Sequence, residues 1–411
     1  MSASAVLDGG PVSRTERAFP CLDGARAIAA TAVVITHVSF WTGDHGPDLL
    51  GRASARLDVG VAIFFVLSGF LLSRPLFLAA ATGRPAPRTA AYLWRRALRI
   101  LPAYWLTVAA ALLLLPGNAG AGPAVWLRHL TLTQIYGAGW IGEGLSHTWS
   151  LCTEVAFYAL LPLAGAGLVR LARPRPDRPG RVLLALGAVT LLGLVWLAWL
   201  WATRPSLAPL DLWLPSFPGW FAAGMALAVL SVADPAWWPA RRVAELGSSL
   251  PTCWAGAAAL FWIATSTVAG PVALAVPTPG QAVTKSLLYL GVAALVVLPL
   301  VFGDQRQGTV RRVLASPPVA FLGEISYGLF LVHVLVLAGS YAAFGWVPFT
   351  GNVVLVLLGT WVVSALLAGL VYVLVERPLR RWRNLVPASR SHRGSGNTDA
   401  VTAVRDTSAS A

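Results

Sequence analysis

The sequence predicts an all-α integral membrane protein, a bundle of about ten transmembrane helices. Of its 411 residues, 56% are hydrophobic and only 12% are charged, a balance typical of polytopic membrane proteins. The apolar residues gather in runs of about 20, the length of helix that crosses a hydrocarbon core of about 30 Å. Lys and Arg concentrate in every second segment between these runs, as the positive-inside rule requires.

Each element of this bundle is expected to be a helix of spanning length. The runs lie near residues 23–41, 57–80, 97–115, 150–170, 182–202, 215–233, 250–269, 284–303, 325–344 and 351–376. The first run follows two arginines and imitates a signal peptide, but it contains Arg26 and no small-residue cleavage pattern follows it. We therefore interpret it as a retained first span.

The charge pattern predicts the orientation. A cytoplasmic N-terminus places 25 of the 31 Lys and Arg residues inside, and an even number of spans returns the C-terminus to the same side. The exceptions outside are Arg52, Arg56, Arg128, Arg204 and Lys285. The expected location is the cell (plasma) membrane, with both termini cytoplasmic.

Composition also predicts one membrane domain with a polar tail at each end. Residues 1–19 and 384–411 are polar and unpatterned, so they are expected to be disordered cytoplasmic tails around one membrane domain, residues 20–383. A net charge of +14 scattered over short loops argues against nucleic-acid binding. No metal site is predicted, because the cysteines and the histidines outside the predicted active site are not spaced as metal ligands are. These residues are Cys21, Cys152, Cys253, His45, His129, His147 and His392.

The first span carries ionisable residues that are costly in lipid and therefore suggest function. Eleven residues separate Arg26 from His37, a rotation of roughly 1100°, so both side chains share one helix face about 16 Å apart. Ala30 and Val33 lie between them, as in the wall of a narrow tunnel, and Asp23 can pair with Arg26 one turn away. His37 is predicted as a general base. The alternative is a histidine bonded to a neighbouring helix.

Two further spans add charged groups. Arg96 and Arg99 lie one turn apart where the third span begins, and guanidinium groups bind phosphate oxygens in bidentate fashion. The alternative is an interfacial positive-inside cluster. Glu154 enters the fourth span with Tyr158 one turn later, and Arg26 and His37 are its expected partners. A purely structural ion pair is the alternative.

Spans nine and two supply expected cavity residues. Ser326 and His333 fall on one face of span nine, so His333 is expected to line the same cavity or to pack beside it. In span two, Ser68 and Gly69 are interpreted first as a site of close helix packing and second as cavity lining.

Six motifs, in order, resemble the membrane-bound acyltransferase family 3, whose members acylate sugars, polysaccharides and some secondary metabolites. They are LDGARAIAATAVVITH, GVAIFFVLSGFLL, RRALRILPAYW, TWSLCTEVAFYALLPL, ISYGLFLVH and ERPLRRW, and the resemblance covers residues 20–383. It implies an essential arginine and histidine pair at Arg26 and His37, a basic pair at Arg96 and Arg99, an acidic residue at Glu154, and Ser326, Tyr327 and His333 near the ninth span.

The resemblance also implies an acyl-CoA co-substrate, usually acetyl-CoA, and no permanently bound cofactor. We expect the donor's phosphates at Arg96 and Arg99, its pantetheine arm beside Arg26, and His37 deprotonating the acceptor hydroxyl while Glu154 or Asp23 balances charge. Ser68, Tyr158, Ser326, Tyr327 and His333 are the other expected cavity residues.

The sequence does not identify the acceptor, for which a cell-surface sugar, a lipid-linked glycan and a macrolide are all candidates. Small residues in the predicted tunnel favour a short acyl group. Two alternatives to an enzyme are a secondary transporter that uses the buried charges as a proton relay, and a non-catalytic sensor or scaffold. Acyl labelling of an acceptor favours the enzyme, whereas flux without chemistry favours transport.

Overall fold

The computed structural model describes residues 19–137, 141–173, 175, 178–204, 209–272, 275–305 and 307–387. Every regular element within these residues is a helix, which confirms the all-α prediction. The helices are α1 Cys21–Trp41, α2 Leu49–Arg56, α3 Val59–Thr82, α4 Thr89–Leu114, α5 Pro123–Leu130, α6 Trp149–Ala172, α7 Gly180–Thr203, α8 Pro218–Val232, α9 Trp238–Ser248, α10 Leu250–Ala264, α11 Pro279–Phe302, α12 Thr309–Leu314, α13 Pro317–Phe344, α14 Val353–Val371 and α15 Arg377–Leu379. A 3₁₀ turn, η4 Ser146–Thr148, precedes α6, and a π-helix, η8 Tyr372–Glu376, joins α14 to α15.

The predicted apolar runs are all helical, but they differ in length. Eight segments of the described chain are long and apolar enough to cross a membrane. The runs near 215–233 and 250–269 instead form α8 and α10, each of 15 residues. The axis bends by 86° between α9 and α10. Pro251 in the first turn of α10 lacks the N–H that would continue the bonding of α9, which accounts for the break. The polytopic fold is confirmed. In the described part of the chain, eight helices, or nine if the bent α9–α10 pair forms one span, are long and apolar enough to cross a membrane, fewer than the ten expected.

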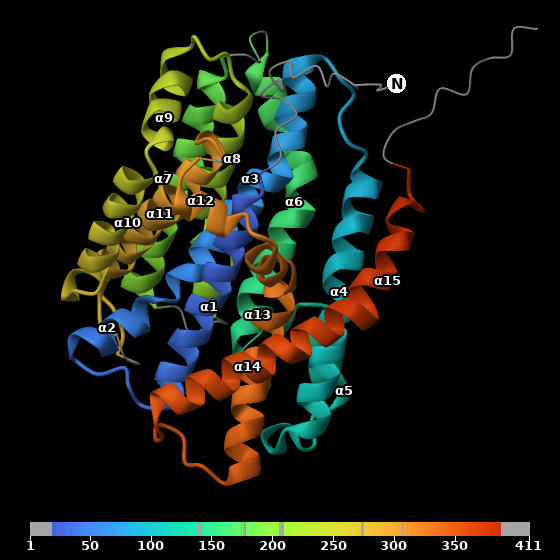
Figure 1. The fold of residues 1–411 in the computed structure, drawn as a ribbon, viewed down its shortest axis with the longest axis vertical. Coiled ribbons are helices and arrows are strands. Elements are labelled where there is room, and N and C mark those ends of the chain that lie inside the picture. Colours follow the sequence, from blue (N-terminus) through green and yellow to red (C-terminus); the bar gives the residue numbers. More distant parts are fainter. Residues whose placement is uncertain are drawn as a thin grey trace, which may run out of the picture.

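The central helices bring the predicted site residues together. In Figure 1, α4, α5 and α15 lie on one side and α7 to α10 on the other, with α1, α3, α6 and α13 between them. α1 packs against α13 and α3, and α3 packs against α8 and α6. The helix α9 lies at the upper end of this view, whereas α2 and α5 lie at the lower end.

The α3 and α8 helices pack closely because each presents a glycine to the other's backbone. A Cβ atom on Gly69 would collide with the carbonyl oxygen of Phe221, and one on Gly224 would collide with that of Val66. Small residues allow helices in a membrane to approach in this way. The interpretation of Gly69 as a packing residue is confirmed, and this contact fixes the neighbouring Ser68.

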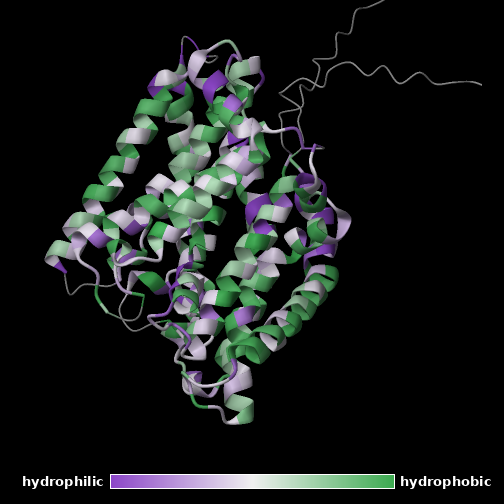
Figure 2. Cartoon of the chain, turned by 60° about the vertical axis from the view of Figure 1, so that its left-hand side comes forward, coloured by the Kyte–Doolittle hydropathy of each residue, from purple (hydrophilic) through white to green (hydrophobic). Residues whose placement is uncertain are grey.

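The surface of the bundle is apolar along the helices. Figure 2 shows hydrophobic residues along the helix lengths and hydrophilic residues mainly near the ends and connections. Large apolar side chains point outward on several helices, including Leu113, Leu163, Leu184 and Leu355, which are all at least 70% exposed. A soluble protein rarely exposes so much apolar surface, whereas hydrocarbon solvates it well.

Candidate active site

A cavity of about 90 Å³ lies among α1, α3, α4, α6 and α13. Eight of the residues predicted for the site line it, although they come from five helices: Arg26, Ser68, Arg96, Arg99, Glu154, Tyr158, Ser326 and Tyr327. Three predicted residues, Asp23, His37 and His333, are not among the described residues that line it. The structure therefore assembles most of the predicted site and separates the histidines from it.

α1 places Arg26 at this cavity as the helical phase predicted. The Arg26 Nη1 atom lies 2.6 Å from Asp23 Oδ1, so the expected pairing within one turn is confirmed. The expectation of a tunnel wall at Ala30 and Val33 is wrong, because both side chains are buried in the packing of α1, at 0% and 1% exposure. Ala30 packs in a cluster with α13 and α14, and Val33 lies against Gly60 of α3.

Glu154 has different neighbours from those expected. Ser68 Oγ donates a short hydrogen bond to Glu154 Oε1, and Tyr158 OH donates to the same oxygen at 2.5 Å. Arg26 is held by Asp23, and no ion pair of Glu154 occurs among the described residues. The predicted direct partnership with Arg26 or His37 is therefore wrong. Two hydroxyl donors satisfy this carboxylate at the cavity wall, as buried polar groups require.

α13 contributes Ser326 and Tyr327 from its first half. Ser326 Oγ donates to the carbonyl of Gly323 at 2.7 Å, and Tyr327 OH donates to the carbonyl of Ile100 on α4 at 2.9 Å. The second bond ties α13 to α4 beside the cavity. Both hydroxyl groups are engaged with the backbone, so they shape the cavity wall.

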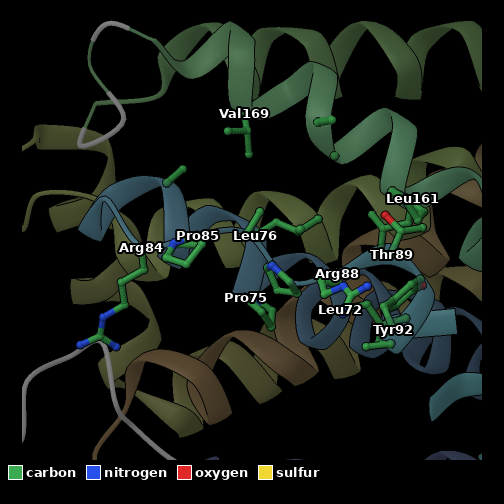
Figure 3. Close-up of a pocket in the computed structure, with 18 of the residues that line it drawn as sticks. Leu72, Pro75, Leu76, Arg84, Pro85, Arg88, Thr89, Tyr92, Leu161 and Val169 are labelled. Atoms are coloured by element: carbon green, nitrogen blue, oxygen red, sulfur yellow. The ribbon is translucent and has the colours of Figure 1, made fainter. Parts of the chain in front are cut away.

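A second cavity, of about 670 Å³, adjoins the first between α3, α4 and α6. The two share Leu71, Leu72 and Arg96 in their linings. The larger cavity has six arginines in its wall: Arg84, Arg88, Arg95, Arg96, Arg170 and Arg173. Figure 3 shows Arg88 near the apolar Leu72 of α3, whereas the Arg84 side chain extends away from Leu72 and Leu76. No carboxylate is among the described residues of this lining, so the cavity suits an amphipathic anion.

Arg96 lies at the junction of the two cavities, and Arg99 lines only the smaller one. The Arg96 guanidinium lies 6.0 Å from the centre of the Tyr158 ring, and its buried Nε has no hydrogen-bond partner among the described residues. Arg99 Nη1 lies 3.8 Å from Glu376 Oε2. Sequence reasoning missed Glu376, although a carboxylate at the end of the last span was a signal. The π-helix turns it inward, and its side chain is only 5% exposed.

His37 lies deeper, at a separate cluster of imidazoles. Its Nδ1 is 2.8 Å from the carbonyl oxygen of Val33 and 3.3 Å from Nε2 of His333. A carbonyl only accepts, so Nδ1 of the neutral ring carries the hydrogen and Nε2 keeps its lone pair. This tautomer suits a general base. His333 is 0% exposed and lies behind His37, which decides between the two sequence-based expectations in favour of packing beside the site.

Sequence reasoning missed a third histidine, His147, which was considered only as a possible metal ligand. It lies in η4, and its ring centre is 4.7 Å from that of His333 and 6.1 Å from that of His37. The 3₁₀ turn before α6 determines its position, so helical phase within α6 gave no signal for it.

Phe330 separates the histidines from the cavity. It lines the 90 Å³ cavity, and its ring centre lies 5.1 Å from that of His147 and 5.9 Å from that of His333. Phe64, another lining residue, meets it edge to face at 6.1 Å. In this conformation the route from the arginines to His37 is interrupted at Phe330.

Comparisons with known proteins agree with this assembly of residues. The family described as an acyltransferase domain, Acyl_transf_3, matches residues 19–372. The chain belongs to this acyltransferase family. Nodulation protein 10 of Rhizobium leguminosarum bv. viciae is 26% identical to the acyltransferase over 399 residues, covering 90% of this chain and 95% of the relative. No solved structure matches it.

Two further relatives carry names that describe chemistry. A putative membrane-bound transacylase, BcsY, of Komagataeibacter xylinus is 26% identical to the acyltransferase and covers 91% of this chain and 86% of the relative. A peptidoglycan O-acetyltransferase, OatA, of Listeria monocytogenes is 23% identical, and covers 76% of this chain but 48% of the relative. The acyltransferase is therefore a multi-pass membrane enzyme, and the transporter and scaffold alternatives lose their support.

Proposed function

We propose that this acyltransferase moves a short acyl group, acetyl in the first instance, from acyl-CoA to a hydroxyl of a carbohydrate or secondary-metabolite acceptor. The donor enters from the cytoplasmic side of the plasma membrane, where both termini lie. The supporting observation is the pair of adjoining cavities, which lead from six arginines to Arg26, Ser68 and Glu154. The donor is a co-substrate, and no bound cofactor is invoked.

The arginines suit the anionic end of the donor. Coenzyme A carries phosphate groups at one end and a thioester at the other, joined by a long flexible arm. Guanidinium groups bind phosphate in bidentate fashion, and Arg96 lines both cavities without a hydrogen bond or ion pair among the described residues. The apolar wall of the larger cavity accommodates the rest of the nucleotide and arm. The thioester then points toward Glu154 and displaces Phe330 to meet His37.

His37 is the proposed general base. The acceptor oxygen attacks the thioester carbonyl carbon while its proton passes to His37 Nε2, and the carbon–sulfur bond breaks as the tetrahedral intermediate collapses. The proton on His37 then passes to the departing thiolate, which leaves as the free thiol. Arg26 lies on the donor side of the same helix, at the small cavity and away from His37, where its positive charge can hold the donor along the proposed path to His37.

Names of relatives support the choice of acceptor and acyl group. The Listeria relative is named for O-acetylation of peptidoglycan, a polysaccharide-containing polymer, and the Komagataeibacter relative for transacylation at a membrane. A hydroxyl-bearing carbohydrate is therefore the first acceptor class to examine.

The test is acyl transfer by the purified, membrane-reconstituted chain. Vesicles that contain it are incubated with radiolabelled acetyl-CoA and a panel of glycans and macrolides, and labelled products are identified by mass spectrometry. We expect His37→Ala to lower transfer by about 10²–10⁴-fold, the usual contribution of general base catalysis, while insertion and folding are retained. Transfer at the wild-type rate in that variant would reject the proposed mechanism.

A further inference from the structure

Three imidazoles from distant parts of the chain meet behind the cavity. They belong to His37 on α1, His147 in η4 and His333 on α13. Their ring centres are 5.0 Å apart for His37 and His333, 4.7 Å for His147 and His333, and 6.1 Å for His37 and His147. Phe330 packs against the two buried rings. Imidazoles in an apolar bundle are costly unless each is bonded, so their bonds define what they do.

The backbone fixes the tautomer of each neutral ring. His333 Nδ1 lies 2.6 Å from the carbonyl oxygen of Phe330, so it carries the hydrogen and leaves a lone pair on Nε2. That lone pair lies 3.3 Å from His37 Nδ1, so it shares the one hydrogen there with the carbonyl oxygen of Val33, which is closer at 2.8 Å. His147 Nε2 lies 3.0 Å from the carbonyl oxygen of Leu331, so it donates there. Its Nδ1 keeps a buried lone pair with no partner among the described residues.

His129 shows the same bonding away from the cavity. Its Nδ1 lies 2.8 Å from the carbonyl oxygen of Val125, the same four-residue step as His37 to Val33, and its Nε2 accepts from the backbone N–H of Gly142 at 3.2 Å. An amide N–H only donates, so this tautomer is certain. Burial also lowers the pKa of His129, which favours the neutral ring. His129 is therefore a matched histidine without a neighbouring imidazole.

Exposure separates the three clustered rings by role. His333 is 0% exposed and His147 is 2% exposed, whereas His37 is partly exposed. Of the three, only His37 can meet a substrate, and its Nε2 has no hydrogen-bond partner among the described residues. The other two rings can act on the reaction only through His37.

We infer that His333 and His147 are positioning residues for acyl transfer, which hold His37 with its Nε2 lone pair toward the acceptor and stabilise the positive charge that His37 acquires. This inference rests on the proposed function, in which His37 is the base. When Nε2 takes the acceptor's proton, the bond from His37 Nδ1–H to His333 Nε2 becomes a bond from a cation. Such bonds are roughly twice as strong as neutral ones, so the gain falls on the transition state.

The unpartnered Nδ1 of His147 fits the same role. A buried acceptor without a donor is unfavourable in the resting enzyme. We assign it the stabilisation of the positive charge on His37, whose ring centre lies 6.1 Å from that of His147. The cluster can hold one added proton at a time, because two adjacent imidazolium ions would repel each other.

The experiment compares two substitutions of similar shape, His333→Gln and His333→Met. The Gln amide oxygen can replace the Nε2 acceptor, whereas the Met side chain cannot. We expect His333→Met to lower kcat about tenfold with the KM for acetyl-CoA unchanged, and His333→Gln to recover most of that loss. Thermal unfolding in detergent and size-exclusion profiles establish the folded fraction of each variant, and rates are expressed per folded molecule.

His129→Met and His129→Gln are the matched controls, because this buried histidine makes the same backbone bond. We expect them to change stability and to leave kcat per folded molecule at the wild-type value. Wild-type kcat in His333→Met, or equal loss of kcat in His333→Met and His333→Gln, would overturn the positioning role. Should His333→Met fail to fold, His147→Asn and His147→Gln replace the pair.

The two His147 variants test the roles of its Nδ1 and Nε2 atoms separately. Asn retains an acceptor near Nδ1, and Gln retains a donor near Nε2. We expect the larger loss of kcat from His147→Gln, and the opposite order would overturn the electrostatic role of Nδ1.

His37→Ala distinguishes failure of the proposed general base from failure of the positioning role. An active His37→Ala enzyme rejects the proposed base itself, whereas an inactive one combined with an unaffected His333→Met enzyme rejects only this inference.

Discussion

Arg56 and Arg96 are arginines of the same bundle with opposite bonding. Arg56 is 2% exposed, and its guanidinium donates to three backbone carbonyls, those of Ala264 at 2.8 Å, Ala269 at 3.2 Å and Gly270 at 2.5 Å. It thereby ties the end of α2 to the connection after α10. Arg96 lines both cavities, has a buried Nε without a partner among the described residues, and contacts Tyr158 through its ring face.

The difference shows that the hydrogen bonds of a buried arginine indicate whether its role is structural or ligand binding. A guanidinium that finds carbonyl partners along its edge needs no ligand, and its removal leaves those carbonyls unsatisfied. A guanidinium that faces a cavity with a donor free can bind an anion, and its removal affects that anion. Substitution at the two positions should therefore give opposite patterns of stability and activity.

The largest effect should follow Arg56→Met. Three carbonyl oxygens lose their donor, each at a cost of about 1–3 kcal/mol, so we expect a loss of roughly 3 kcal/mol or more of stability. The activity of the molecules that fold should be unchanged. Thermal unfolding in detergent measures the first quantity, and labelled acetyl transfer per folded molecule measures the second.

Arg52→Met is the control for this prediction, because it removes the same charge one turn earlier on α2. Arg52 is half-buried and donates to no carbonyl among the described residues, so we expect a smaller loss of stability than for Arg56→Met. If Arg56→Met lowers kcat in fully folded protein, Arg56 belongs to the functional machinery and the contrast with Arg96 fails.

Arg96→Ala should have the second-largest effect. Loss of a charge-assisted hydrogen bond to phosphate costs about 1.5–3 kcal/mol, so the KM for acetyl-CoA should rise by about 10- to 100-fold with little change in unfolding temperature. Arg241→Ala, on exposed α9 and 3.7 Å from Glu245, removes a comparable charge outside both cavities. An unchanged donor affinity in Arg96→Ala would contradict the phosphate role.

Helical phase explains why much of the site could be predicted from the sequence. Arg26, Ser68, Glu154 and Tyr158 lie within long regular helices, where spacing alone determines which face a side chain occupies. The apolar runs likewise define the helices, because a segment in lipid must satisfy its own backbone. These predictions needed no knowledge of how the helices pack.

The features that escaped prediction depend on irregular backbone or on packing between helices. His147 lies in a 3₁₀ turn, and Glu376 lies in a π-helix, so regular phase does not place either of them. The end of α10 at Ala264 shortened the span expected over residues 250–269, and the sequence did not predict the bend between α9 and α10. The position of Phe330 between cavity and histidines depends on how α13 packs against its neighbours, which spacing along one helix does not reveal.

Glu376→Gln should have the smallest effect. It tests whether Arg99, like Arg96, is available to bind the donor. Glu376 Oε2 lies 3.8 Å from Arg99 Nη1, so its charge competes with the donor's phosphates for that guanidinium. A partly exposed pair of this kind contributes about 0.2–1 kcal/mol, so removing the carboxylate charge should lower the KM for acetyl-CoA by about threefold. Glu324→Gln, which alters a pair with Arg380 outside both donor cavities, is the control.

The double variant Arg99→Ala/Glu376→Gln decides what the pair does. If Glu376 acts by competition, its substitution should have no effect once Arg99 is absent, and the two single effects should have opposite signs. If Glu376→Gln instead raises KM as Arg99→Ala does, the carboxylate holds Arg99 in the binding geometry. Arg99 would then be positioned by a protein partner, as Arg56 is, and the distinction between bonded and free cations would apply to Arg96 but not to Arg99.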